Sequence, residues 1–164
     1  MQLYLLLQLF LIVILALNLN LEVGDCLKQN QLKKIQNNSM SEIRLGILGG
    51  GQLGSMLSVA AKKINIKTLI YSDDRDAPAQ NFCDKFMFGD YKDKNKINDF
   101  VKKVSIVTYE FENIPYETLN EINKFKTVNP KPSINRLIQH RLAEKDFVNK
   151  LNIRTTRYVG IEKK

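Results

Sequence analysis

A strand, a tight turn and the start of a helix are encoded by Ile43-Arg44-Leu45-Gly46-Ile47-Leu48-Gly49-Gly50-Gly51-Gln52-Leu53-Gly54. The aliphatic run is short and stops at glycine, which is typical of a buried parallel strand. Gly49, Gly51 and Gly54 form the pattern G-x-G-x-x-G, whose glycines allow a tight turn, close approach to a phosphate and close packing of helix on strand. The segment therefore predicts a phosphate-binding turn in an α/β domain.

Strands and helices alternate along the rest of the chain. Short apolar runs predict further strands at 66–71, 85–88, 104–109 and 126–128. Apolar residues at helical spacing, including Met56 and Leu57 in the first helix, predict helices at 52–63, 95–103, 115–125, 133–139 and 141–151. Pro78 is placed to open one further short helix. The alternation predicts a Rossmann-like open parallel sheet with helices on both faces.

The first 39 residues differ from the rest in composition. Residues 3–17 are almost wholly apolar, and residues 28–39 are polar and rich in Gln and Asn. The apolar run is shorter than the roughly 20 residues of a transmembrane helix, and no Lys or Arg precedes it. We interpret residues 1–39 as an upstream extension outside the fold, with Met40 as the start of a cytoplasmic protein. A membrane anchor or targeting segment within residues 1–25 is the alternative.

The charge and the cysteine content limit the classes of function. The 164 residues carry a net charge of +8 and are 44% hydrophobic, which is typical of a globular protein. We interpret the basic excess as a solvated Lys-rich surface that also suits a phosphorylated substrate, and we expect no nucleic-acid partner. Cys26, Cys83 and the single His140 form no metal-ligand cluster, so we expect no metal site in the chain.

The residue at the end of the second predicted strand bears on the choice of ligand. Dinucleotide-dependent oxidoreductases need an acidic residue there to bind a ribose hydroxyl. This chain has Ser72 at that position, and the acidic residues Asp73 and Asp74 come only after it. A nicotinamide cofactor is therefore the weaker interpretation of the glycine turn.

Three more segments, taken with the glycine turn, resemble one family. They are Asp76-Ala77-Pro78-Ala79, Val107-Thr108-Tyr109-Glu110-Phe111-Glu112-Asn113-Ile114-Pro115 and Gln139-His140-Arg141-Leu142-Ala143-Glu144-Lys145. In this order, the segments resemble N5-carboxyaminoimidazole ribonucleotide synthase, an ATP-grasp ligase of purine biosynthesis. The resemblance runs from about Ile43 to Tyr158.

The resemblance implies a fold, a reaction and a division into domains. Residues 40–152 would form the pre-ATP-grasp domain, and residues 153–164 would begin the ATP-lid domain. ATP and Mg²⁺ would serve to carboxylate 5-aminoimidazole ribonucleotide with bicarbonate, in a homodimer. The family's ATP and Mg²⁺ sites find no counterpart in this chain, so we expect no catalytic residue and no synthase activity from it alone. A non-catalytic nucleotide-binding module is the alternative.

The resemblance also implies the substrate-binding residues. The backbone N–H groups of Gly49, Gly50, Gly51, Gln52 and Leu53 would cradle the 5′-phosphate or the ribose of the ribonucleotide.

A second set of candidates follows the strand predicted at 104–109. Alternate residues of an extended segment share a face, so Glu110 and Glu112 would both face the ligand while Phe111 packs inward. Glu110 is expected to bind the amine or the ribose hydroxyls of the substrate. Glu112 and Asn113 either join it or cap the helix that opens at Pro115.

The last predicted helix contains one further candidate. Lys145 either reaches the phosphates of a nucleotide or lies on a solvated face. His140 stands where the family usually has Asp, and we interpret it as a surface residue of the helix rather than a catalytic group. Cys83 is expected in the core.

Overall fold

The computed structural model describes residues 44–161, so the predictions about residues 1–39 and Met40 lie outside the described part. Four strands form one sheet in the order β3-β2-β1-β4, and every neighbouring pair is parallel. The strands are β1 (Arg44–Leu48), β2 (Lys67–Ser72), β3 (Lys85–Phe88) and β4 (Ile106–Tyr109). The predicted Rossmann-like parallel sheet is confirmed.

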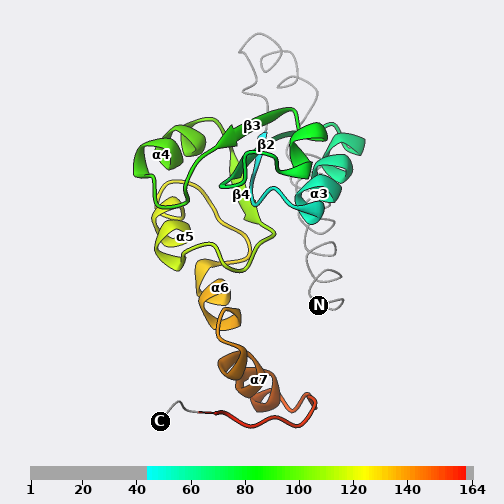
Figure 1. Ribbon diagram of the computed structural model, residues 1–164, viewed down its shortest axis with the longest axis vertical. Coiled ribbons are helices and arrows are strands. Elements are labelled where there is room, and N and C mark those ends of the chain that lie inside the picture. Colours follow the sequence, from blue (N-terminus) through cyan, green and yellow to red (C-terminus); the bar gives the residue numbers. More distant parts are fainter. Residues whose placement is uncertain (1–43, 162–164) are drawn as a thin grey trace, which may run out of the picture. The chain divides into compact units, whose positions relative to one another are not determined.

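Helices cover both faces of this sheet. They are α3 (Gln52–Lys63), the 3-10 helix η1 (Pro78–Asn81), α4 (Lys94–Lys102), α5 (Tyr116–Ile122), α6 (Pro132–Ile138) and α7 (Arg141–Lys150). Figure 1 shows α3 on one side of the sheet, with α4 and α5 on the other. The chain passes from β1 outward to β2 and β3 and then returns to β4 on the far side of β1. No helix in residues 44–161 is long and apolar enough to cross a membrane.

The core between the sheet and the helices is built around aromatic rings. The Tyr71 ring centre lies 5.6 Å from that of Phe100 and 5.8 Å from that of Tyr91. The Tyr71 hydroxyl donates a hydrogen bond of 2.8 Å to the backbone oxygen of Asp90. Burial and the nearby charges of Asp93 and Asp90 raise the pKa of Tyr71 to about 12. These contacts join β2 to the loop after β3.

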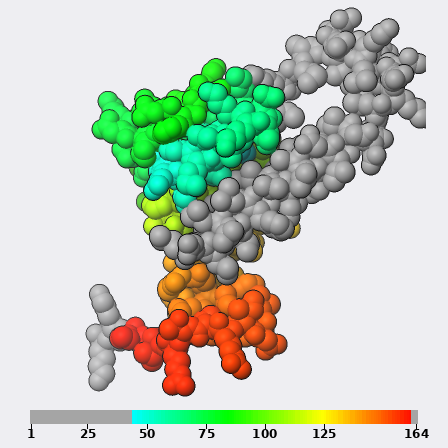
Figure 2. Space-filling view, turned by 90° about the vertical axis from the view of Figure 1, so that its right-hand side faces the viewer, coloured from blue at the N-terminus to red at the C-terminus, as the bar shows by residue number. Residues whose placement is uncertain are grey.

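The buried face of α3 differs from the predicted one. Leu57 and Ala61 are buried as their spacing indicates, whereas the side chain of Met56 is 45% exposed. Figure 2 looks at this side of the unit, where α3 lies at the surface. Small residues bring the helix close to the strand, because a Cβ on Gly54 would lie 2.8 Å from the Gly49 backbone oxygen. The face of α3 that packs against the sheet thus includes Gly54, Leu57 and Ala61, and Met56 lies outside it.

The prediction of a fifth strand at residues 126–128 is wrong. Val128 forms only an isolated parallel bridge with Val107. The Val107 N–H donates to the Thr127 oxygen, and the Asn129 N–H donates to the Val107 oxygen, both at 2.9 Å. Pro130 follows directly and has no N–H with which to continue the ladder. The other predicted strands and helices are present with shifted ends.

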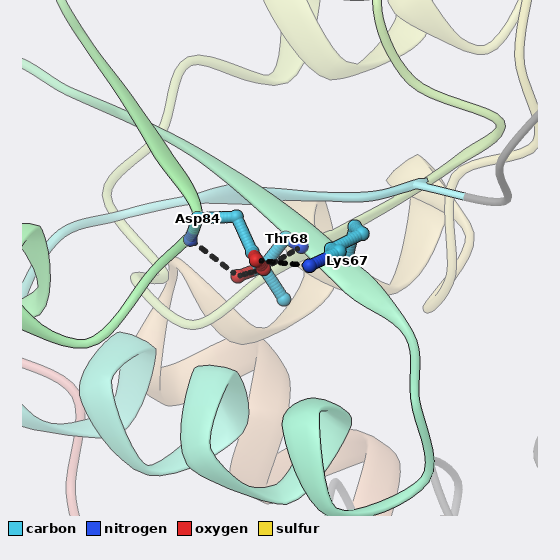
Figure 3. Close-up of polar contacts among 3 residues, drawn as sticks. All are labelled: Lys67, Thr68 and Asp84. Atoms are coloured by element: carbon cyan, nitrogen blue, oxygen red, sulfur yellow. Dashed lines mark hydrogen bonds and ion pairs between the residues drawn. The ribbon is translucent and has the colours of Figure 1, made fainter.

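Asp84 fastens the start of β3 to the start of β2 (Figure 3). Its carboxylate accepts a hydrogen bond of 2.9 Å from the Thr68 N–H and lies 3.1 Å from Lys67 Nζ. Burial by itself would raise the pKa of Asp84, but the Thr68 hydrogen bonds and the Lys67 charge hold it below its ordinary value. This contact lies at the amino edge of the sheet, opposite the glycine turn.

Candidate functional site

The glycine turn and the end of β4 meet at the carboxyl edge of the sheet. The Glu110 N–H donates to the Leu48 oxygen at 3.1 Å, which carries the β1–β4 pairing one residue past β4. The Glu110 carboxylate then accepts a hydrogen bond of 2.9 Å from the Gly51 N–H. Because the chain leaves β1 in one direction and returns to β4 in the other, this is the switch point at which open α/β sheets bind ligands.

Gly49 allows this approach between the turn and the carboxylate. Its φ is +108°, a conformation that residues with a side chain rarely adopt. A Cβ on Gly49 would lie 2.6 Å from Glu110 Oε1 and 2.8 Å from Glu110 Cγ. The first glycine of the motif therefore makes room for Glu110 as well as for the turn.

The loop after β2 closes the other side of the turn. The Ala79 N–H donates to the Gly50 oxygen at 3.0 Å, and a Cβ on Gly50 would lie 2.5 Å from the Ala77 Cβ. Ser72 is only 2% exposed, and its hydroxyl accepts a hydrogen bond from the Asp74 N–H. Ser72, which stands where a dinucleotide site would bind a ribose, thus stabilises the loop that follows it.

Two of the N–H groups predicted to cradle a phosphate are hydrogen-bonded within the protein. The Gly49 N–H donates to the Tyr71 oxygen at 2.9 Å, and the Gly51 N–H donates to Glu110. Gly51 is the N-cap of α3 without a side-chain hydrogen bond, and the first turn of the helix holds no acidic residue. The first N–H groups of a helix have no partner within it. The N–H groups of Gln52 and Leu53 are therefore placed to meet an anion.

Glu110 is a half-buried carboxyl group beside a second acidic residue. Burial raises its pKa, the Gly51 N–H opposes the rise, and the charge of Glu112 adds to it. The predicted inward packing of Phe111 is wrong, because this side chain is 38% exposed. β4 ends at Tyr109, so the alternation of faces that the prediction assumed does not extend through the loop.

Glu112 and Asn113 are both exposed and follow Glu110 in this loop. The alternative that they cap the next helix is wrong, because the N-cap of α5 is Pro115 and the start of α5 has no side-chain capping hydrogen bond. The Glu112 backbone oxygen instead accepts a hydrogen bond of 2.7 Å from Gln139 Nε2. The sequence analysis missed this role of Gln139, although the residue lies in one of the segments that carry the resemblance.

Tyr91 is a second residue that the sequence analysis missed. It follows β3 and is only 5% exposed. Burial and the charge of Asp73 raise its pKa, hydrogen bonds from Ser72 and Asp73 oppose the rise, and the charge of Glu110 adds to it. Tyr91 therefore lies at the same edge as Glu110. Its position shortly after the third predicted strand was the available signal, because the carboxyl ends of parallel strands share an edge.

The candidates in α7 have local partners. The Lys145 ammonium lies 5.2 Å from the centre of the Tyr158 ring. His140 is exposed as predicted and is the N-cap of α7, where its Nδ1 accepts a hydrogen bond of 3.3 Å from the Ala143 N–H. Cys83 is half-buried rather than fully in the core. Because its ammonium lies against the Tyr158 ring, Lys145 is engaged with the segment after α7, and the structure assigns it no contact with the glycine turn.

Two known proteins are similar to this chain in sequence. The bifunctional purine synthesis protein purC/E of Dictyostelium discoideum is 36% identical over 118 residues, which are 72% of this chain and 12% of that protein. An N5-carboxyaminoimidazole ribonucleotide synthase of Staphylococcus epidermidis is 32% identical over 118 residues, which are 72% of this chain and 32% of the enzyme.

Solved structures of the same enzyme are similar to the fold. One is the N5-carboxyaminoimidazole synthase of Aspergillus clavatus in complex with ADP and 5-aminoimidazole ribonucleotide. It superposes with a TM-score of 0.60 and 29% identity over 70% of this chain and 31% of that chain. Solved members of this enzyme group thus bind adenine nucleotides and the ribonucleotide.

The chain spans about a third or less of the length of these relatives. Residues 40–139 match the ribonucleotide synthetase preATP-grasp domain. This match covers the four strands, the glycine turn and Glu110. The chain belongs to the family of ribonucleotide synthetase preATP-grasp domains.

Proposed function

We propose that the glycine turn, the N-terminus of α3 and Glu110 bind a ribonucleotide monophosphate. On this proposal, the chain supplies the substrate-binding part of an N5-carboxyaminoimidazole ribonucleotide synthase. The observation that carries it is the hydrogen bond between the Gly51 N–H and Glu110, which brings a carboxylate beside the uncapped start of a helix. Relatives with this activity, one of them bound to 5-aminoimidazole ribonucleotide, support the choice of ligand.

The phosphate would bind at the start of α3. The N–H groups of Gln52 and Leu53 have no partner within the helix, and the N-terminal end of a helix carries partial positive charge. No acidic side chain in the first turn opposes an anion there. A phosphate at this position would accept hydrogen bonds from the N–H groups of Gln52 and Leu53. The Gly51 N–H would not contribute, because it is already bound to Glu110.

Glu110 would bind the other end of the ligand. Its Oε1 accepts from Gly51, which leaves Oε2 to accept a hydrogen bond from a ribose hydroxyl or from the exocyclic amine. A carboxylate repels a phosphate, so the two groups must contact different parts of the same molecule. A nucleoside monophosphate meets this condition, since its single phosphate and its hydroxyls lie at opposite sides of the ribose.

ATP and Mg²⁺ are the co-substrate and the metal that the resemblance implies. No three His, Cys, Asp or Glu side chains within the described part of the chain are grouped as metal ligands. We assign no step to the metal here. The homodimer and the cytoplasmic location stay predictions. Light scattering and fractionation of the native source would test them.

Calorimetric titration of the 164-residue chain with 5-aminoimidazole ribonucleotide and, separately, with NAD tests the proposal. We expect the ribonucleotide to bind and the affinity to fall at least about tenfold in Glu110→Gln, because a charge-assisted hydrogen bond contributes about 1.5–3 kcal/mol. Glu117→Gln is the matched control, since Glu117 is an exposed residue of α5 away from the turn. Binding of NAD without binding of the ribonucleotide would reject the proposal.

A further inference from the structure

Two side-chain amides of α6 and its C-cap hold the loop that carries the carboxylates. Gln139 Nε2 donates to the Glu112 oxygen at 2.7 Å and to the Ile114 oxygen at 2.8 Å. Asn135 Nδ2 donates to the same Ile114 oxygen at 3.0 Å. Both amides bind backbone carbonyls, so they fix the path of the loop whatever side chains it carries. We call this set of three hydrogen bonds the amide clamp.

Few other hydrogen bonds support the loop, whose Ile114 side chain is fully buried in the core. The Glu110 N–H is bound to β1, and regular structure resumes only with α5. Between these points, the one backbone hydrogen bond runs from the Ile114 N–H to the Phe111 oxygen, at a long 3.4 Å. The amide clamp therefore supplies most of the hydrogen bonding that determines where residues 111–114 lie.

The two amides differ in how far they are buried. Asn135 is fully buried, and its side-chain oxygen has no hydrogen-bond partner among the described residues. Burying an unpaired amide oxygen costs free energy, and the bond to the Ile114 oxygen offsets part of that cost. Gln139 is exposed, and its amide binds two carbonyls at once. Gln139 can therefore be substituted without opening a cavity in the core.

We propose that Gln139, supported by Asn135, is a positioning residue for the ribonucleotide site. By holding the backbone at Glu112 and Ile114, the amide clamp keeps Glu110 against Gly51 and keeps Glu112 close to it. This role rests on the proposed function. His140 follows Gln139 directly and caps α7, so the same clamp joins the site to α7.

The test compares Gln139→Met with Gln80→Met in the full chain. Methionine preserves the length and removes the donor, and Gln80 is an exposed glutamine of η1 whose side chain makes no hydrogen bond within residues 44–161. We expect Gln139→Met to speed amide hydrogen exchange in residues 111–114 and to weaken ribonucleotide binding, each about tenfold, the equivalent of about 1.4 kcal/mol. Gln80→Met should change neither.

The pKa of the Glu110 carboxyl group, followed by carbon NMR, separates positioning from a general loss of stability. A released loop would admit water, so the pKa of Glu110 should fall toward its ordinary value in Gln139→Met. Gln139→Glu should be at least as disruptive, because a carboxylate repels the two carbonyl oxygens. Unchanged exchange and an unchanged Glu110 pKa in both variants would overturn the proposal, as would faster exchange with unchanged affinity.

The design keeps the two proposals separable. If the wild-type chain does not bind the ribonucleotide, the proposed function is rejected. The exchange rates and the Glu110 pKa would still establish whether the amide clamp holds the loop.

Discussion

Replacing Gly49 with alanine tests whether the glycine turn is shaped around Glu110. At a φ of +108°, a residue with a Cβ is strained, typically by about 1–2 kcal/mol. The added Cβ would also lie 2.8 Å from Glu110 Cγ, and a rotation of this side chain away from the Cβ would break the hydrogen bond between its carboxylate and the Gly51 N–H. Overpacking of this kind costs about 1–3 kcal/mol, so we expect Gly49→Ala to lower the free energy of unfolding by roughly 3 kcal/mol.

A Glu110→Ala background separates the two causes. That substitution removes the three atoms that would lie nearest the new Cβ, while the strained backbone conformation stays. Gly49→Ala should then cost only about 1–2 kcal/mol, which leaves a coupling free energy of about 1–2 kcal/mol between the two positions. Gly160→Ala is the control, because its Cβ would meet only the flexible end of Leu142.

Urea unfolding followed by far-ultraviolet circular dichroism measures these differences in the 164-residue chain. The two single variants, the double variant and the control are unfolded under the same conditions. If Gly49→Ala costs as much without Glu110 as with it, the turn is not shaped around the carboxylate and the reasoning is refuted.

Three further predictions concern other parts of the chain. Asp84→Asn should lower the free energy of unfolding by about 1 kcal/mol at pH 7. Because the pKa of Asp84 is lowered in the folded state, this loss should shrink as the pH falls below about 4 and vanish only below the folded-state pKa; urea unfolding across this pH range checks it. Tyr71→Phe should cost about 1 kcal/mol at pH 8 through the lost bond to Asp90. That cost should shrink above about pH 10, since the hydroxyl has a pKa of about 12 only when folded, and unfolding at pH 8 and pH 11 tests the trend. In a Cys26→Ser chain, Cys83 should react with iodoacetamide at least about tenfold more slowly at pH 8 than in 8 M urea, because burial raises the pKa of its thiol; mass spectrometry follows the reaction.

The local elements were predictable because they depend on short-range patterns. The apolar run before Gly49 and the helical spacing after Gly51 identify β1 and α3 without reference to the rest of the chain. The alternation of strands and helices then predicts a parallel sheet, and the sheet places Glu110 and the glycine turn at one edge. The prediction of a fifth strand was wrong because Pro130, which has no N–H, limits how far this segment can pair with β4.

The details of the site were not predictable because they join distant segments. Gly51 and Glu110 are 59 residues apart, and Gln139 is 25 residues from Ile114. Phe111 turned outward because the chain leaves the strand before reaching it, so a pattern that holds within a strand no longer applied. Tyr91 depends in the same way on the parallel strand order, which places the ends of β3, β2 and β4 at one edge of the sheet.

The sequence by itself determined where β1 ends and α3 begins, that the strands form a parallel sheet, and which glycine begins the G-x-G-x-x-G motif. The tertiary structure alone decided which backbone N–H groups of that motif stay free. Those of Gly49 and Gly51 are taken by Tyr71 and Glu110, which leaves the start of α3 to meet an anion. The reason is physical: a backbone N–H bonds to whichever acceptor packs against it, and these two acceptors come from β2 and from the loop after β4.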